Sequence, residues 1–317
     1  MIKVDFAPLE GITDSIYRKA HHAHFGGVDR YFMPFLSPTM HNTLTHKEDR
    51  ELPMADSVPF QAVPQILTKV SADFLWAAQV CADRGYTEVN LNIGCPSGTV
   101  VSKGKGAGML ANAAHLDAFF NEIFSKSPIP VSVKTRIGMA EEDEFPRLVE
   151  IFNQYPIKEL IVHPRTRKDF YKAPIHMDAF QFAYENCTAP LSYNGDICSA
   201  GDIAAIQNRF PKLERIMIGR GLVGDPGMLI PGGTTAGALE AFHAALTNEY
   251  IRVFGSERNA MFRLKENWHH LICRFEGGEK LYKRLRKTTD IQEFRAITTE
   301  IFRTLPLAPR LQPDWLP

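Results

Sequence analysis

Short apolar and β-branched runs recur along about the first 220 residues and predict eight strands. We expect these strands at Val4–Phe6, Arg30–Met33, Phe60–Val63, Glu88–Leu91, Val131–Lys134, Leu160–Val162, Leu191–Tyr193 and Ile216–Ile218. Between them the apolar positions have helical spacing, so that Val70, Phe74, Ala77 and Cys81, for example, share one helix face. Strand and helix therefore alternate along this part of the chain.

Strands that are apolar on both faces and are joined by crossover helices are typical of a parallel sheet. Eight such units close into a (β/α)8 TIM barrel, which is the α/β fold that we expect; a doubly wound open sheet is the alternative. Polar, proline or glycine residues stand at the ends of the predicted strands or shortly after them, at Pro8, Gln65, Asn92, Lys134, His163, Asn194 and Gly219. In a barrel all these strand ends meet at the rim that carries the active site, and this favours the barrel.

Strand signals stop after residues 232–235, and helical patterns continue to about Arg303, before a proline-rich tail. We therefore divide the chain into a catalytic barrel at residues 1–235 and a helical domain at residues 236–317. Residues 251–290 carry ten Lys and Arg side chains against five Asp and Glu. A solvated helix surface would explain this charge, and a face that binds nucleic acid is the functional alternative.

Composition narrows the class of protein. With 317 residues, 44% of them hydrophobic, the chain can bury a large core, and its 36 basic and 36 acidic side chains cancel. No run approaches the roughly 18 apolar residues of a membrane helix, and the first residues lack the apolar stretch of a signal peptide, so we expect a cytoplasmic protein. The five cysteines include no C-x-x-C pair, so we expect neither disulfides nor a metal site.

Cys95 is the strongest candidate for chemistry, because it lies just beyond the fourth predicted strand on a turn shaped by Gly94 and Pro96. A cysteine here could be a nucleophile, a proton donor or an inert small residue. The glycine-rich segment 98–108 follows, in the longest interval between predicted strands, and is typical of a mobile lid. This segment does not match G-x-x-x-x-G-K-[ST], so we expect no ATP site in it.

Lys134 and His163 end the fifth and sixth predicted strands. A buried ammonium needs an anion, which for Lys134 is either a strand carboxylate or a bound ligand. His163 is either a hydrogen-bonded core histidine or part of the site. Glycine stands at the ends of strands seven and eight, in Asn194-Gly195-Asp196 and Gly219-Arg220, where barrels bind phosphate. These ends predict a phosphorylated cofactor.

Seven short motifs, in order along the predicted barrel, resemble the tRNA-dihydrouridine synthase family. They are Ala7-Pro8-Leu9-Glu10-Gly11-Ile12-Thr13-Asp14, Pro64-Gln65, Asn90-Leu91-Asn92-Ile93-Gly94-Cys95-Pro96-Ser97, Val133-Lys134-Thr135-Arg136-Ile137-Gly138, His163-Pro164-Arg165-Thr166, Asn194-Gly195-Asp196-Ile197 and Ile218-Gly219-Arg220-Gly221. The helical C-terminal region also looks like that of the family. Leu9 stands where the family usually has methionine, which exchanges one apolar side chain for another.

The resemblance implies an FMN enzyme that uses NADPH to reduce the C5–C6 double bond of a uridine in tRNA, giving 5,6-dihydrouridine. Hydride would pass from flavin N5 to C6, and Cys95 would protonate C5 as general acid. Asn92 and Arg165 would contact the uracil, and the basic helices would contact tRNA. The matching cofactor positions are Ala7, Pro8 and Leu9 against the flavin ring, Gln65, Lys134 and His163 along its polar edge, and Asn194, Gly195, Asp196, Gly219 and Arg220 at its phosphate. The resemblance implies no protein partner.

Three other functions remain open. A flavin barrel that acts on a free pyrimidine, like the dihydroorotate or dihydropyrimidine dehydrogenases, would not need a basic helical domain. A noncatalytic RNA-binding barrel would leave Cys95, Lys134 and the two glycine motifs without a purpose. An aldolase that uses Lys134 as a Schiff base would leave Cys95 unexplained.

Overall fold

Nine strands form a single sheet in which every pairing is parallel, in the computed structural model that describes residues 2–311 and 313. Their order is β3-β2-β1-β9-β8-β7-β6-β5-β4. The strands are β1 (Lys3–Phe6), β2 (Arg30–Phe32), β3 (Gln61–Val63), β4 (Gln65–Ile66), β5 (Val89–Ile93), β6 (Val131–Arg136), β7 (Leu160–His163), β8 (Leu191–Asn194) and β9 (Arg215–Ile218). Each of the eight predicted strands is therefore present.

The two edge strands of this order, β3 and β4, are halves of one barrel strand interrupted at Pro64. Proline has no N–H and cannot donate to a strand ladder, which explains the interruption. β3 pairs with β2 and β4 pairs with β5, and the Pro64 carbonyl accepts from the Asn90 N–H at 2.8 Å. The sheet thus closes, which confirms the predicted (β/α)8 barrel.

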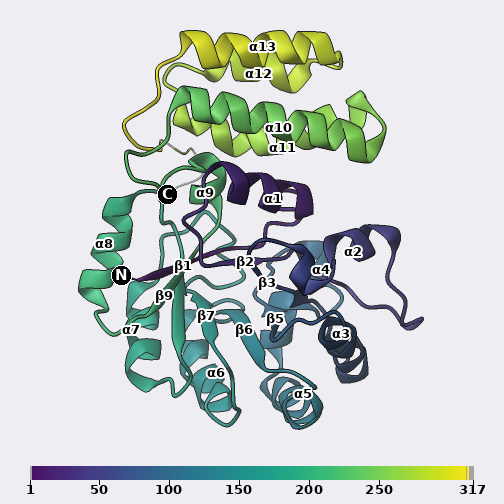
Figure 1. Cartoon of the computed structure of the whole chain (residues 1–317). Helices are drawn as coiled ribbons and strands as arrows, with labels where there is room; N and C mark the ends of the chain where they lie inside the picture. Colours follow the sequence, from purple (N-terminus) through teal and green to yellow (C-terminus); the bar gives the residue numbers. More distant parts are fainter. Residues whose placement is uncertain (1, 312, 314–317) are drawn as a thin grey trace.

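Helices surround this barrel on its outside (Figure 1). They are α1 (Ser15–His24), α2 (His46–Glu51), α3 (Ser71–Asp83), α4 (Gly98–Val101), α5 (Ala113–Lys126), α6 (Phe145–Phe152), α7 (Met177–Asn186), α8 (Ala200–Arg209) and α9 (Arg220–Gly224), with the short 3-10 helices η1 (Ala55–Ser57), η2 (Gly106–Ala111) and η3 (Glu142–Glu144). Within α3, Phe74, Ala77 and Cys81 are buried as predicted, whereas Val70 is the N-cap and 43% exposed. The predicted apolar face therefore begins one turn later.

The C-terminal part is helical, as the sequence predicts, and lies over α1 and α9 at one side of the barrel (Figure 1). It comprises α10 (Ala236–Phe254), α11 (Glu257–Leu271), η4 (Ile272–Arg274), α12 (Glu279–Lys287) and α13 (Ile291–Thr304). Its core surrounds the buried Trp268, whose indole N–H donates to Nε2 of His243 at 2.9 Å. The proposed boundary at residue 235 coincides with the N-cap of α10, Thr235; the division into two domains stays a prediction.

The barrel ends in a buried ion cluster at the N-terminal side of its strands. Arg30 donates to Asp5 at 2.9 and 2.5 Å and to Glu159 at 2.5 Å, and it lies 3.5 Å from a carboxylate oxygen of Glu88. Arg215 adds a second cation at 2.9 Å from Asp5. Burial raises the pKa of Glu159 to about 7, although Arg30 opposes this shift. Lys158 is the third cation, at 2.5 Å from Glu88. Three carboxylates, two arginines and one lysine therefore compensate one another at this end.

No helix within the described ranges is both long and apolar enough to cross a membrane. The described residues also contain no group of three or more His, Cys, Asp or Glu side chains placed to hold a metal ion. All five cysteines are free thiols.

Candidate active site

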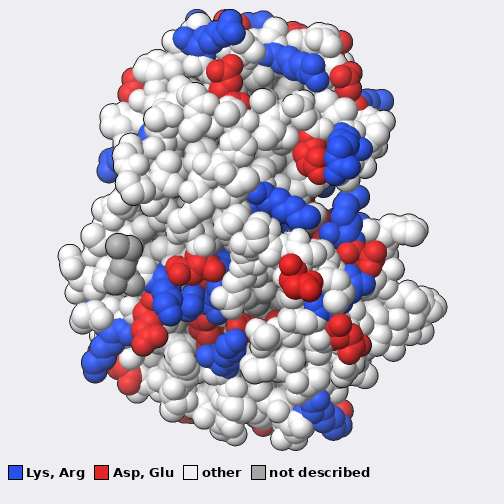
Figure 2. Space-filling view, in the orientation of Figure 1, with Lys and Arg blue, Asp and Glu red and all other residues white. Residues whose placement is uncertain are grey.

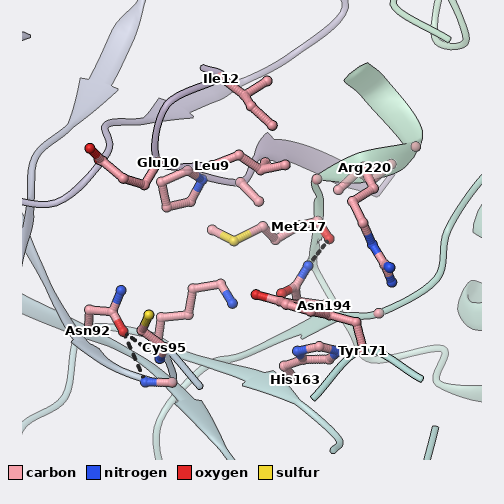
Figure 3. A pocket seen from close by; sticks show the side chains of 18 of the residues that line it. Leu9, Glu10, Ile12, Asn92, Cys95, His163, Tyr171, Asn194, Met217 and Arg220 are labelled. Atoms are coloured by element: carbon pink, nitrogen blue, oxygen red, sulfur yellow. Dashed lines mark hydrogen bonds between the residues drawn. The ribbon is translucent and has the colours of Figure 1, made fainter. Parts of the chain in front are cut away.

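A cavity of about 910 Å³ opens at the C-terminal ends of the barrel strands (Figure 3). Every predicted site residue except Arg165 lines it. These are Ala7, Pro8, Leu9, Gln65, Asn92, Cys95, Lys134, His163, Asn194, Gly195, Asp196, Gly219 and Arg220. The barrel thus brings together residues that are up to about 210 positions apart in the sequence, at the rim where this fold builds its sites.

Asn92 holds the turn that carries Cys95. Its Oδ1 accepts from the backbone N–H groups of Gly94 at 3.0 Å and Cys95 at 2.9 Å (Figure 3). Gly106 packs so closely behind the turn that a Cβ there would lie 2.8 Å from the Cys95 carbonyl oxygen. The thiol is partly exposed to the cavity on a turn that is fixed from both sides.

The segment 98–108, which we interpreted as a mobile lid, forms α4 and the start of η2. Ala107 is buried and donates its N–H to the Cys95 carbonyl at 3.0 Å. None of these residues lines the cavity. The segment therefore supports the cysteine turn from behind, and its position does not favour a lid.

Lys134 enters the cavity from β6, where it is paired with Asn92 of β5. In the part of the chain that the structure describes, no carboxylate forms a salt bridge with it, which removes the strand-carboxylate alternative. Burial lowers the pKa of the Lys134 ammonium to about 7, and Arg136 adds to this shift. An anionic ligand would relieve both effects.

His163 lies among cations. Burial lowers its pKa well below the usual value, and Arg136, Lys134, Arg165 and Arg220 lower it further. The Arg165 guanidinium can only donate, so at 3.1 Å it makes His163 Nε2 an acceptor and leaves the proton of the neutral ring on Nδ1. His163 is therefore a neutral N–H donor in a positively charged wall.

Tyr171 and Arg136 also line the cavity, and sequence reasoning missed both as site residues. The Tyr171 ring lies 5.0 Å from the Arg136 guanidinium carbon and 5.1 Å from that of Arg220, and it stacks on His163. Arg136 follows Lys134 by two residues on β6, a spacing that places both on one face and could have revealed it. No sequence period marks Tyr171, which lies in a loop.

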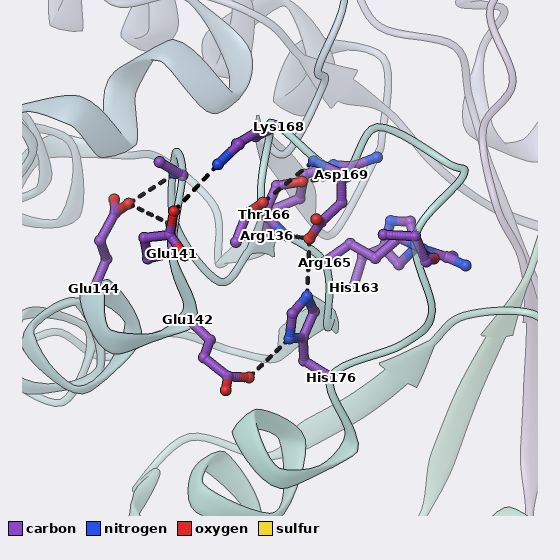
Figure 4. Close-up of polar contacts among 12 residues, drawn as sticks. Arg136, Glu141, Glu142, Glu144, His163, Arg165, Thr166, Lys168, Asp169 and His176 are labelled. Carbon is purple, nitrogen blue, oxygen red and sulfur yellow. Dashed lines mark hydrogen bonds and ion pairs between the residues drawn. The ribbon is translucent and has the colours of Figure 1, made fainter.

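That loop, which follows β7, is held by polar contacts (Figure 4). Asp169 accepts from the Thr166 N–H at 2.7 Å and lies 3.0 Å from Nε2 of His176. Phe170, beside Tyr171, has a φ of +56°, which is rare for a bulky residue. Backbone strain of this kind concentrates at functional sites, and here it places two half-exposed aromatic rings at the rim.

Arg165 lies behind the cavity wall, so the predicted direct contact with uracil is not available in this arrangement. Its side chain is fully buried, and its guanidinium donates to Asp196 at 2.9 and 2.5 Å and to the Ala173 carbonyl at 2.6 Å. Asp196 also accepts from Arg220 at 2.9 Å. Arg165 therefore fixes Asp196 and, through it, the direction of Arg220.

Glycine packs closely against other residues at the predicted phosphate end. A Cβ on Gly195 would lie 2.7 Å from the Ile175 side chain, and one on Gly219 would lie 3.3 Å from the Ala7 Cβ. The helical part contributes His269 and His270, at the end of α11, to the same cavity. Sequence reasoning missed both, because nothing in the local pattern indicates that α11 reaches the barrel mouth.

Comparison with known proteins gives the family. The family model described as "Dihydrouridine synthase (Dus)" matches residues 5–296. A "Probable tRNA-dihydrouridine synthase" of Staphylococcus aureus (strain COL) is 27% identical, over 93% of this chain and 91% of the relative. The "tRNA-dihydrouridine synthase B" of Pasteurella multocida (strain Pm70) is also 27% identical, over 71% of this chain and 67% of the relative.

Solved structures give the fold. A mutant of morphinone reductase in complex with tetrahydroNAD aligns with a TM-score of 0.52 and 9% identity, over 71% of this chain and 85% of that one. Histamine dehydrogenase from Rhizobium sp. 4-9 aligns with a TM-score of 0.50 and 11% identity, over 71% of this chain and 45% of that one. The family match confirms the resemblance carried by the seven motifs and the class of enzyme that it implies, a flavin-dependent oxidoreductase. The chain belongs to the dihydrouridine synthase (Dus) family.

Proposed function

We propose that this enzyme binds FMN and uses NADPH to reduce the C5–C6 double bond of a uridine in tRNA, giving 5,6-dihydrouridine. The observation that carries the proposal is the joint placement of the Cys95 thiol and the unpaired Lys134 ammonium in one large cavity. The printed names of the relatives support tRNA as the substrate.

The residues present fit FMN. A volume of about 910 Å³ is in the range of cofactor pockets, and a Lys134 without a carboxylate partner suits an anionic ring edge. Gly195 and Gly219 line the cavity without a side chain, so a phosphate could approach their backbone. Ala7, Pro8 and Leu9 would contact the ring, Gln65, Lys134 and His163 its polar edge, and Asn194, Gly195, Gly219 and Arg220 the phosphate, with Asp196 orienting Arg220.

When bound, FMN supplies hydride that originates from NADPH. Cys95 donates a proton to C5, because its thiol lines the cavity and a thiol can act as general acid toward a developing enolate. Asn92 keeps the Cys95 turn in place from below. We propose that Asn92, Arg136 and Tyr171, which line the cavity, contact the uracil, while Arg165 acts as a positioning residue.

A base in folded RNA must leave its stack to enter such a cavity, and contacts with the RNA backbone must offset the cost. Lys and Arg side chains spread over the helical part and along its junction with the barrel (Figure 2). Helix α12 contributes Lys280, Lys283, Arg284, Arg286 and Lys287. This distribution favours RNA over a free pyrimidine, which would need none of these cations, and the built cavity argues against a noncatalytic barrel.

The test is to incubate FMN-loaded protein and NADPH with unmodified tRNA and to measure dihydrouridine by nucleoside mass spectrometry. We expect product from the wild type and roughly a hundredfold less, or lower still, from Cys95→Ala. Cys187→Ala, which changes a half-buried cysteine that does not line the cavity, is the matched control. If NADPH reduces the flavin but no dihydrouridine forms, the free-pyrimidine function is favoured. If the protein binds no flavin, the proposal is contradicted.

A further inference from the structure

Five side chains form a continuous chain of hydrogen bonds through the barrel interior, from the Cys95 turn toward the opposite end of the strands. We call this chain the file; its members are Asn92, Gln65, Asn90, Ser132 and Glu88. Asn92 Nδ2 donates to Gln65 Oε1 at 2.8 Å, and Gln65 Nε2 donates to Asn90 Oδ1 at 2.7 Å. Asn90 Nδ2 donates to Ser132 Oγ at 2.9 Å, and Ser132 Oγ donates to Glu88 Oε1 at 2.6 Å. The file therefore ends in the ion cluster at the base of the barrel.

The acceptor at the base dictates the direction of every bond. Glu88 lies 2.5 Å from Lys158 and 3.5 Å from Arg30, and a carboxylate held by two cations can only accept. The single proton of Ser132 points to Glu88 Oε1 at 2.6 Å rather than to the Val89 carbonyl at 3.5 Å, which leaves its lone pairs for Asn90. Each amide that follows has its N–H on the side of the base and its oxygen on the side of the cavity.

The last amide in the file is that of Asn92, and its orientation matters for the site. With Nδ2 committed to Gln65, Oδ1 faces the N–H groups of Gly94 and Cys95 and accepts from both. A flipped amide would set donors against donors at the turn. Below Asn92 and Gln65, which line the cavity, water cannot easily replace a lost partner, because Asn90, Ser132 and Glu88 are at most 3% exposed.

We infer that Glu88, Ser132 and Asn90 are positioning residues for Cys95: the carboxylate at the base fixes the direction of the file, and the file fixes the amide of Asn92 and the cysteine turn. None of these three residues lines the cavity. The effect on turnover rests on the proposed function, whereas the effect on the Cys95 turn does not.

The experiment compares Ser132→Ala, which cuts the file, with Lys158→Ala. Lys158 contacts Oε2 of Glu88 and leaves Oε1 free to accept from Ser132, so its removal weakens the base without cutting the file. The first measurement is the rate at which iodoacetamide alkylates Cys95, followed by peptide mass spectrometry, and it needs neither flavin nor RNA. The second is dihydrouridine formation by the FMN-loaded enzyme.

For Ser132→Ala we expect alkylation to be at least about threefold faster, because the turn opens, and kcat to fall roughly tenfold or more with little change in KM for tRNA. Ser132→Thr, which keeps the hydroxyl, should restore both values toward wild type. Lys158→Ala should match wild type in both. If Ser132→Ala does not fold, Glu88→Gln serves instead, since an amide end no longer fixes the direction, and the same changes are expected.

If folded Ser132→Ala had the same Cys95 alkylation rate and the same turnover as the wild type, the inference would be overturned. Lys158→Ala changing as much as Ser132→Ala would also overturn it, because the effect would then come from a loosened base. A wild-type enzyme that forms no dihydrouridine would contradict the proposed function alone, and the alkylation rates would still decide whether the file positions Cys95.

Discussion

The two ends of the barrel each bury several charges, and they balance them differently. At the base, Arg30 contacts the carboxylates of Asp5, Glu88 and Glu159. At the mouth, Asp196 binds Arg165 and Arg220, while Lys134 and Arg136 form no salt bridge with a carboxylate in the described part of the chain. A cluster that neutralises itself holds the fold together, whereas a cluster left positive is arranged for an anion that arrives from outside.

The strongest way to break this comparison is to remove the central cation of the base. Arg30→Met would leave the buried carboxylates of Asp5, Glu88 and Glu159 with Arg215 and Lys158 as the remaining cations, and we expect it to lower the free energy of unfolding by about 3–5 kcal/mol. Chemical denaturation measures this change. Arg147→Met is the control: its ion pair with Glu150 is about two-thirds exposed on each side, so the expected change is within about 0.5 kcal/mol. Equal effects of the two variants would contradict the assignment of the base as structural.

The same exchange at the mouth should act in the opposite direction on stability. Lys134→Met removes a cation that has no carboxylate partner, and we expect flavin-free protein at pH 6 to gain about 1–2 kcal/mol in the free energy of unfolding. Affinity for reduced FMN should fall roughly tenfold or more, measured by flavin fluorescence, because a charge-assisted contact is lost. Lys158→Met, at the base, should leave flavin affinity unchanged. A destabilised Lys134→Met protein with normal flavin affinity would show that the mouth is structural.

The dependence of stability on pH sharpens the comparison further. Glu159 has a pKa of about 7 in the folded chain against an ordinary 4.5, so the folded state binds more protons and this group makes stability fall as pH rises from 4.5 to 7. Lys134 has a folded pKa of about 7 against an ordinary 10.5, so the unfolded state binds more protons and stability rises from pH 7 to 10.5. When the free energy of unfolding is measured from pH 5 to 10, Glu159→Gln should lose the fall in stability as the pH rises to 7, and Lys134→Met should lose the rise above pH 7. If both variants lost the same part of this pH dependence, the separate roles of the two ends would be contradicted.

Much of the barrel could be predicted from sequence, because parallel strands buried on both faces read as short apolar runs. The division of one barrel strand into β3 and β4 at Pro64 could not, since it depends on how the two neighbouring strands pair with it. Strand ends also predicted most of the residues that line the cavity, because every strand of a barrel points its end at the same rim. Arg165 fails this reasoning: it lies two residues past His163, where the chain has left the strand and the side chain turns behind the wall.

What the sequence could not predict depends on contacts between distant segments. Whether Lys134 meets a carboxylate is decided by the side chains of neighbouring strands, and only the folded structure shows that it does not. The ring of Tyr171 is placed by a loop whose strained residue, Phe170, has no sequence signature. His269 and His270 reach the cavity because α11 packs over α9, a long-range contact that no local pattern encodes.

The smallest expected effect concerns the helical part and extends the comparison beyond the barrel. Lys283 is exposed on α12, and Lys212 is exposed before β9, on the side of the base. If the cations of the helical part contact phosphates, Lys283→Ala should weaken tRNA binding a few-fold and reduce the slope of log K against log salt by about 1. Lys212→Ala should change neither quantity, measured by filter binding at about 50 to 200 mM salt. Equal losses in both variants would mean that RNA is held by unspecific charge over the whole surface, whereas a loss confined to Lys283→Ala would place the RNA over the helices, on the side from which the uridine must enter the cavity.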